Sequence, residues 1–352
     1  MDTKIIKLQQ LGQTETDAAY AEAAEVIQKG GLVAFPTETV YGLGANALDA
    51  EAAARIYAAK GRPSDNPLIA HISREEQLFE LAEYVPESAK LLMKAYWPGP
   101  LTMIFKKKAI VPDGTTGGLD TVAVRMPDHP VARRLIEEAS VPVAAPSANT
   151  SGRPSPTSAE HTAQDMDGKI DMILDGGSCR IGIESTILDM TEEIPVILRP
   201  GYITREMLAE LLGEVRVDKA LDPEKWKDFR PKAPGQKYRH YAPKAELTLV
   251  EGASDAVVKK ICELTEQAVK EGKKVGIICT DETRNCYTQG LIKSIGSREI
   301  LESVAHNLYE ILRGFDETGV DVIYSEAFSS NALGYAVMNR LVKAAGHKEI
   351  RV

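Results

Sequence analysis

The sequence predicts an α/β fold with two domains, in which a larger mixed-sheet domain is followed by a smaller parallel one. The length of 352 residues suits about two domains of ~150 residues each. Short apolar strands alternate with helical patterns in two separate series along the chain. A charged stretch rich in proline separates the two series. Alternation of this kind is typical of strands covered by helices.

Composition excludes several classes of protein. Hydrophobic residues make up 43% and charged residues 26%, which is ordinary for a globular chain and excludes collagen or a long disordered tail. The net charge of −9 argues against a general nucleic-acid coat, which needs positive charge. Four cysteines without a C-x-x-C pair indicate reduced thiols rather than a disulfide framework. No secretory signal or membrane span is present, so we expect a cytoplasmic location.

The first domain is expected to reach Val217 and is assigned to residues 1–217. A helix over 50–60 follows Asp49, a suitable N-cap, and Gly61 closes it. Further helices are predicted at 17–29, 130–139 and 204–212. Strands are predicted at 32–35, 68–72, 101–105, 122–125, 141–145, 172–174, 186–190 and 196–198. Because helices and strands alternate, we expect one mixed α/β domain.

Residues 218–245 are predicted to form an interdomain linker, because prolines interrupt a weakly periodic, charged stretch. After it, strands at 247–250, 275–279 and 322–325 alternate with helices at 255–271, 297–314 and 331–345. Three β/α units of this kind predict a small Rossmann-like parallel sheet over residues 246–352.

Two cations follow the end of the second predicted helix. Lys60 and Arg62 flank the flexible Gly61. Arg can hold a phosphate or carboxylate through two hydrogen bonds, and Lys supplies a point charge. The pair therefore suits an anion. A solvated helix end is the plainer alternative, because cations also favour the helix dipole there.

Hydroxyl and amide side chains gather after two other strands. Ser147 and Asn149 follow the strand at 141–145, where they could form an oxyanion nest or a simple turn. Thr37 and Thr39 follow the strand at 32–35 together with Glu38, and could hold a small polar ligand or satisfy their own backbone.

Three further residues interrupt or end apolar strands. His71 lies within the strand at 68–72, where a histidine is more often a satisfied core residue than a ligand. Arg125 and Arg199 each end an apolar strand. A charged group beside a core needs a partner or a ligand, so both arginines are candidate ligand residues.

Well-known nucleotide and nucleophile motifs are absent. The chain has no G-x-x-x-x-G-K-[ST], no G-x-G-x-x-G after a strand, no G-x-S-x-G and no H-E-x-x-H. The cysteine and histidine spacings do not match a zinc site either. A nucleotide bound here would be held by scattered cations and strand-end loops.

Taken in order, the clusters resemble the threonylcarbamoyl-AMP synthase family, which has a YrdC-type catalytic domain. The motifs are FPTETVYGLG, KGRPSDNPL, PGPLTMI, VAVRMPDHP, APSANTSG and the stretch from ESTI to LRPG. Each is weak alone, but the ordered set is specific. KYRHYAPK and the second α/β domain resemble the long, two-domain form of the family, in which the linker closes over the active site.

The resemblance implies a nucleotidyltransferase. L-threonine, bicarbonate and ATP would give threonylcarbamoyl-AMP and pyrophosphate, with Mg²⁺ accompanying the ATP. A partner transferase would then modify the adenosine next to the anticodon of tRNA. The reaction needs no covalent enzyme nucleophile, which agrees with the missing motifs. Its demands are positioning and charge neutralisation.

The resemblance also implies roles for individual residues, with no protein metal ligands. The polar group around bicarbonate and phosphate would be Lys60, Arg62, Ser147 and Asn149. The residues around L-threonine would be Thr39, His71, Arg125, Ala145 and Ser185. The residues around ATP would be Arg62, Asn66, Thr121, Ser147, Ser155, Arg199 and Tyr241, with Tyr238 as the alternative to Tyr241.

Two other functions compete with this one. A basic concave surface could bind RNA weakly, but the net charge of −9 argues against RNA binding as the main role. A carbamoyl transferase like the related domain of hydrogenase-maturation proteins would need zinc-finger and acylphosphatase regions, which this chain lacks.

Overall fold

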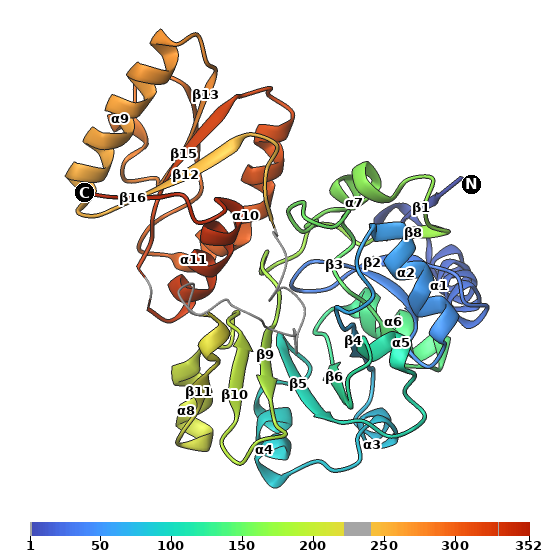
Figure 1. Cartoon of the computed structure of the whole chain (residues 1–352). Helices are drawn as coiled ribbons and strands as arrows, with labels where there is room; N and C mark the ends of the chain where they lie inside the picture. Colours follow the sequence, from blue (N-terminus) through green and yellow to red (C-terminus); the bar gives the residue numbers. More distant parts are fainter. Residues whose placement is uncertain (1, 222–240, 330) are drawn as a thin grey trace. The chain divides into compact units, whose positions relative to one another are not determined.

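The computed structural model describes residues 2–221, 241–329 and 331–352 (Figure 1). These residues divide into two compact units. The first unit holds residues 2–151, 155–180 and 184–221, and the second holds 152–154, 181–183 and the chain from 241 onward. The predicted linker spans 218–245, and its residues 222–240, which include Tyr238, lie outside the described residues.

A mixed sheet forms the centre of the first unit. Its strand order is β1-β8-β2-β3-β7-β4-β6-β5-β9-β10-β11. Neighbours are parallel in β4/β6 and β5/β9, and antiparallel in β3/β7, β7/β4 and β5/β6. The strands are β1 (Lys4–Lys7), β2 (Val33–Pro36), β3 (Tyr41–Asn46), β4 (Ile69–His71), β5 (Leu101–Lys106), β6 (Thr121–Arg125), β7 (Val143–Ala144), β8 (Met172–Asp175), β9 (Thr186–Asp189), β10 (Val196–Arg199) and β11 (Arg216–Val217).

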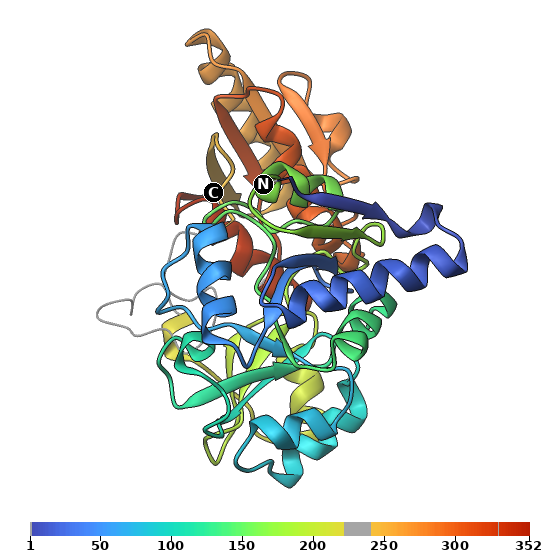
Figure 2. The same cartoon turned by 90° about the vertical axis from the view of Figure 1, so that its right-hand side faces the viewer.

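Helices cover both faces of this sheet, because alternate strand residues point to opposite sides. Val33, Phe35 and Met172 pack against α1 and α6, which run beside each other in Figure 2. Their sequence neighbours Ala34 and Ile173 belong to the larger cluster on the other face. The helices are α1 (Gln13–Gln28), α2 (Ala50–Lys60), α3 (Glu76–Leu81), α4 (Glu87–Tyr96), α5 (Asp113–Thr116), α6 (Pro130–Ala139), α7 (Ala159–Met166) and α8 (Arg205–Leu212).

Helix α2, which ends at Lys60, has the predicted bounds and caps. Asp49 Oδ1 accepts hydrogen bonds from the backbone N–H groups of Glu51 at 2.8 Å and Ala52 at 3.2 Å. Gly61 ends the helix with φ of 60°, in the left-handed region that favours glycine. Both terminal signals therefore act as predicted and fix where Lys60 stands.

The structure also contains elements that the sequence did not predict. Residues 41–46 form strand β3, although the sequence indicated only a ligand-binding motif there. Gly44 in this strand is required by close packing, because a Cβ on it would meet Phe35 at 2.6 Å. Strand β1 and the helices α3, α4 and α7 are further additions. The predicted strand at 141–145 shortens to β7, because only Val143 and Ala144 pair with β3 and β4.

The second unit is built on a parallel sheet with the order β14-β13-β15-β12-β16 (Figure 1). Five strands are present instead of the three predicted, since the short, exposed edge strands β14 and β16 have little apolar pattern. The elements are β12 (Glu246–Glu251), α9 (Ser254–Lys270), β13 (Val275–Cys279), β14 (Leu291–Ser294), α10 (Leu301–Asp316), β15 (Val322–Glu326), α11 (Leu333–Ala344) and β16 (Glu349–Arg351).

Helix α10 begins four residues later than predicted, at Leu301 instead of 297. The backbone N–H of Ser297 donates to Ser303 Oγ at 3.0 Å, and that of Arg298 donates to the Glu282 carboxylate at 3.0 Å. These side chains satisfy the donors outside a helix, so residues 297–300 form a loop. None of the described helices combines the length and apolarity that crossing a bilayer would need.

Two short loops that precede residue 184 belong to the second unit. The buried Arg313 of α10 donates to the carbonyl of Pro154 from Nε at 3.1 Å and from Nη2 at 2.6 Å. Gly182 lies so close to α10 that a Cβ on it would be 2.5 Å from the carbonyl oxygen of His306. The loops at 152–154 and 181–183 thus depend on α10 for their packing.

Candidate active site

Arg125 ends β6 and is the centre of a buried polar cluster in the first unit. Its Nη1 donates to Thr39 Oγ1 at 2.9 Å, and its Nε donates to the Gly99 carbonyl at 3.2 Å. Its Nη2 lies 2.7 Å from Glu38 Oε2. A charged strand end therefore has partners from two distant loops, as expected for a charge placed beside a core.

His71 lies opposite Arg125 in the β4–β6 register. Burial, together with the positive charges of Arg125 and Arg199, lowers the pKa of His71 to about 3. The imidazole is therefore neutral at pH 7. Its Nδ1 is 3.1 Å from the carbonyl of Ile69, which can only accept, so Nδ1 donates.

Arg199 and Ser185 extend this cluster. Arg199 Nη2 donates to Ser185 Oγ at 3.1 Å, and its Nε donates to the Ser185 carbonyl at 3.1 Å. Ser185 Oγ also shares a hydrogen bond of 2.8 Å with Thr102 Oγ1. Residues predicted at L-threonine thus form two hydrogen-bonded pairs, Thr39 with Arg125 and Ser185 with Arg199, the last of which the resemblance placed at ATP. His71 lies near enough to both arginines for their charges to act on it.

Lys60 organises a second cluster. Its buried Nζ donates to the carbonyls of Ser147 and, at 2.6 Å, Asn149. Ser147 Oγ donates to Asn149 Oδ1 at 2.5 Å. The ammonium group therefore ties the end of α2 to the turn that follows β7, and this excludes the solvated helix end as an account of Lys60.

Arg62 and Asn66 continue this cluster along the chain. Arg62 Nη2 donates to the carbonyl of Pro67 at 3.1 Å and to that of Asn66 at 3.3 Å. Asn66 is buried, and its Oδ1 accepts no hydrogen bond within the described residues. A buried amide oxygen without a donor is costly, which is consistent with a ligand group at this position.

The two clusters meet at the start of β3. The N–H of Leu43 donates to the Pro146 carbonyl at 2.8 Å, and the N–H of Ala148 donates to the Tyr41 carbonyl at 2.8 Å. The turn that carries Ser147 and Asn149 is thereby fixed beside the loop that carries Thr39. Gly42 packs against Ala145, since a Cβ on Gly42 would lie 3.2 Å from that of Ala145.

Thr121, Ser155 and Tyr241 are the remaining predicted residues. Thr121 begins β6 and Arg125 ends it, so their Cα atoms are about 13 Å apart at ~3.3 Å per residue. Ser155 is buried and donates to Glu184 Oε1 at 2.6 Å. In the second unit Tyr241 stacks on Tyr309 with ring centroids 5.3 Å apart. A contact of Tyr241 with ATP stays a prediction.

Sequence reasoning did not assign a role to two carboxylates that the structure places among these residues. Glu38 contacts Arg125, and Glu184 accepts from Ser155. Glu38 follows β2 and Glu184 precedes β9, and each lies within a motif quoted from the sequence. An acidic residue among buried apolar and hydroxyl side chains was the available signal, because a carboxylate is rarely buried without a partner.

The described residues hold no group of three or more His, Cys, Asp or Glu side chains placed to bind a metal ion. The hydrogen-bond donors in the Arg125 and Lys60 clusters are cations, hydroxyls and amides, which suit phosphate and carboxylate oxygens rather than Mg²⁺. A Mg²⁺ ion would therefore have to be held mainly by a nucleotide.

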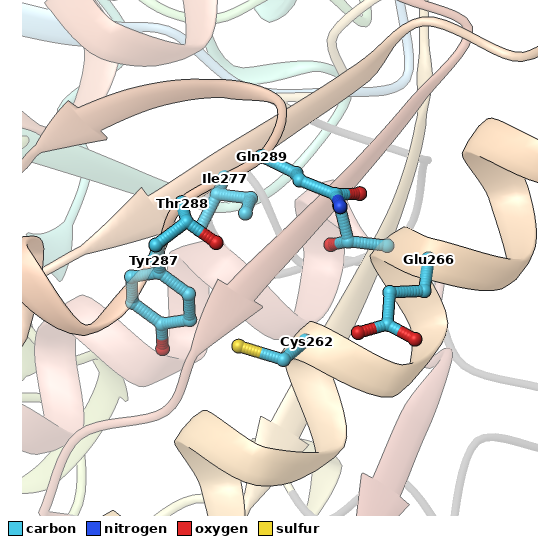
Figure 3. A pocket seen from close by; sticks show the side chains of 7 residues that line it. Cys262, Glu266, Ile277, Tyr287, Thr288 and Gln289 are labelled. Atoms are coloured by element: carbon cyan, nitrogen blue, oxygen red, sulfur yellow. The ribbon is translucent and has the colours of Figure 1, made fainter.

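The second unit has a small cavity of its own, of about 30 Å³ (Figure 3). This is room for about two water molecules at ~10–15 Å³ each. Cys262 and Glu266 of α9 face Tyr287 and Thr288 across it in Figure 3. The residues predicted from the sequence do not line it.

Comparisons with known proteins cover nearly the whole chain. Residues 25–201 match the Sua5–YciO–YrdC family, described as telomere recombination, and residues 203–346 match the family described as the C-terminal domain of threonylcarbamoyl-AMP synthase. The threonylcarbamoyl-AMP synthase of Pyrococcus abyssi is 53% identical, covering 94% of this chain and 95% of its own. The chain belongs to the threonylcarbamoyl-AMP synthase family.

Other members of the threonylcarbamoyl-AMP synthase family support the assignment. The Bacillus subtilis (strain 168) synthase is 50% identical over 95% of each chain. A crystal structure of P. abyssi Sua5 complexed with L-threonine superposes with a TM-score of 0.92 at 50% identity and covers 100% of both chains. This member therefore shares the two-part α/β fold of a synthase that binds L-threonine.

Proposed function

We propose that the protein is an L-threonylcarbamoyladenylate synthase, which condenses L-threonine, bicarbonate and ATP to threonylcarbamoyl-AMP and pyrophosphate. The observation that carries the proposal is the Arg125 cluster, buried in the first unit of a chain that is 50% identical, over its full length, to a protein crystallised with L-threonine. A buried guanidinium held by fixed partners is suited to the carboxylate of an amino acid.

The proposed chemistry has two bond-forming steps. The amine of threonine adds to the carbonyl carbon of bicarbonate with loss of water, which gives a carbamate. A carbamate oxygen then attacks the α-phosphorus of ATP, and the bond to the leaving pyrophosphate breaks. Neither step needs a covalent enzyme nucleophile, so binding both substrates in line and neutralising charge are the tasks of the protein.

The second cluster supplies the cations for that task. Lys60 and Arg62 lie beside Ser147, Asn149 and Asn66, whose polar groups suit bicarbonate and phosphate oxygens. When bound, Mg²⁺ would screen the phosphate charge, and it would enter with the nucleotide because the described residues provide no cage for it. Transfer of the product to tRNA by a partner enzyme, and a cytoplasmic location, are part of the same proposal.

Pyrophosphate release by the purified full chain tests the proposal. We expect release from MgATP only when L-threonine and bicarbonate are both present, and none with L-threonine omitted. A rate that does not depend on L-threonine would contradict the proposal.

A matched pair of lysines tests the second cluster. Lys60 and Lys94 each lie in the last turn of a helix, but only Lys60 is buried. We expect Lys60→Met to slow pyrophosphate release by about 10²–10³-fold, the usual cost of one stabilising donor. Lys94→Met should have the wild-type rate. Equal rates in both variants would remove Lys60 from the site, and circular dichroism would check that each variant is folded.

A further inference from the structure

Glu38 is the least satisfied buried charge in the described part of the first unit. It follows β2 within the loop that carries Thr37 and Thr39, and it is 1% exposed. Neither of its carboxylate oxygens accepts a hydrogen bond within the described residues. A buried carboxylate without a donor is energetically costly, so the position calls for a hydrogen-bond donor beyond those that the described residues provide.

Arg125 is the only described cation in contact with Glu38, and it too has an atom without a hydrogen-bond partner. Arg125 Nη2 lies 2.7 Å from Glu38 Oε2, yet the two atoms do not have the geometry of a hydrogen bond. Arg125 is 4% exposed, and its Nη2 has no acceptor among the described residues. A pair whose purpose was to orient the arginine would be expected to form parallel hydrogen bonds instead.

Neighbouring side chains among the described residues do not donate a hydrogen bond to Glu38 either. Burial lowers the pKa of His129 and raises that of Cys179, and both lie close enough for the charge of Glu38 to favour their protonated forms. Neither donates a hydrogen bond to Glu38. The hydroxyl of Thr37 is occupied, because it donates to the Val40 carbonyl at 2.7 Å. The loop is thus held by its own hydrogen bonds, while the carboxylate of Glu38 keeps its accepting capacity.

Glu38 and Arg125 together present one negative and one positive group, and both carboxylate oxygens of Glu38 and the Nη2 of Arg125 lack a hydrogen-bond partner among the described residues. An α-amino acid carries the complementary pair, an ammonium group and a carboxylate, a few ångströms apart. We propose that Glu38 is a further substrate-binding residue, whose carboxylate accepts a hydrogen bond from the α-ammonium group of L-threonine while Arg125 binds the α-carboxylate. This inference rests on the proposed function, and it identifies what holds the nitrogen that will form the carbamate.

The test is a comparison of two ligands on two full-length proteins by calorimetric titration. 3-Hydroxybutanoate is threonine without its α-amino group. We expect Glu38→Gln to weaken the binding of L-threonine at least tenfold and to leave the binding of 3-hydroxybutanoate unchanged. Equal weakening of both ligands would show that Glu38 only orients Arg125, and unchanged binding of both would remove Glu38 from the site. Either result overturns the inference.

Two additions keep the test decisive. If Glu38→Gln does not fold, Glu38→Asp keeps the charge but withdraws it by one methylene, and it should show the same selective loss of at least threefold. Wild-type protein that neither binds L-threonine nor releases pyrophosphate with it would contradict the proposed function itself. Wild-type turnover combined with normal threonine binding by the variant would contradict only the role of Glu38.

Discussion

His71 is a neutral imidazole next to two arginines. At this position a positive charge would lack water and face Arg125 and Arg199, and both effects lower its pKa. A neutral ring can donate to the Ile69 carbonyl without adding to the charge that a substrate carboxylate has to balance. The residue thus leaves the positive charge of the cluster to the arginines.

The depressed pKa of His71 predicts how stability depends on pH. The folded-state pKa of about 3 lies below the ordinary 6.5, so between these values the unfolded chain binds one more proton. Stability is therefore lost as the pH falls from about 7. We expect the loss between pH 7 and pH 5 to be about 2 kcal/mol larger in the wild type than in His71→Gln.

Urea unfolding of both proteins at the two pH values would measure this difference. Both proteins contain the same carboxylates, so the difference between their pH dependences reports on His71 alone. The same pH dependence in wild type and variant would show that His71 is solvated or already paired when protonated.

Helix α9 carries one buried hydroxyl without a partner. Thr265 is 2% exposed, and its Oγ1 has no hydrogen bond within the described residues. It lines the cavity of the second unit. Because Thr and Val have similar shapes and similar helix propensities, Thr265→Val should raise the free energy of unfolding by about 1 kcal/mol.

Thr283 provides the matched control, because its buried hydroxyl donates to Glu326 at 2.5 Å. Thr283→Val should lower the free energy of unfolding by about 1–3 kcal/mol, since it leaves the carboxylate with one donor fewer. Thermal unfolding of both variants gives the comparison. A loss of stability in Thr265→Val would mean that its hydroxyl has a partner, such as a water molecule in the cavity.

Elements also differ in how well the sequence predicts them. Helices α2 and α6 and strand β13 have the predicted bounds, because strong caps or a continuous apolar run mark them. The exposed edge strands β1, β14 and β16 were not predicted, since pairing with one neighbour needs little apolar pattern.

The candidate site was also only partly predictable from the sequence. The order of its motifs indicated which residues belong to it, but not the contacts between them. Arg125 and Thr39 are 86 residues apart and meet only because of how β4, β6 and β7 pair. The contact of Glu38 with Arg125 depends on the same pairing, so local sequence patterns did not indicate it.

At the scale of the molecule, the short loops at 152–154 and 181–183 are packed in the second unit. Residues 181–183 directly precede Glu184 and Ser185, which belong to the candidate site. Their packing on α10 therefore bears on where these two side chains are held. Holding the loop at 181–183 is thus a structural task of α10 within the second unit.

Substituting Gly182 tests this task. Gly182 has φ of 84°, and a Cβ there would lie 2.5 Å from the His306 carbonyl oxygen of α10. Gly319, also in the second unit, has φ of 65° and no atom within 4 Å of a Cβ. Gly319→Ala should cost about 1 kcal/mol from backbone strain, whereas Gly182→Ala should cost about 2–4 kcal/mol because overpacking is added.

Thermal unfolding would measure the two costs, and pyrophosphate release would be assayed well below both unfolding temperatures. We expect Gly182→Ala to weaken turnover under these conditions, because the displaced loop moves Ser185 and its partner Arg199. Gly319→Ala should retain the wild-type rate, since no site residue adjoins it in sequence. Equal stability losses and equal rates in the two variants would show that the loop at 181–183 can leave α10 without consequence for the site.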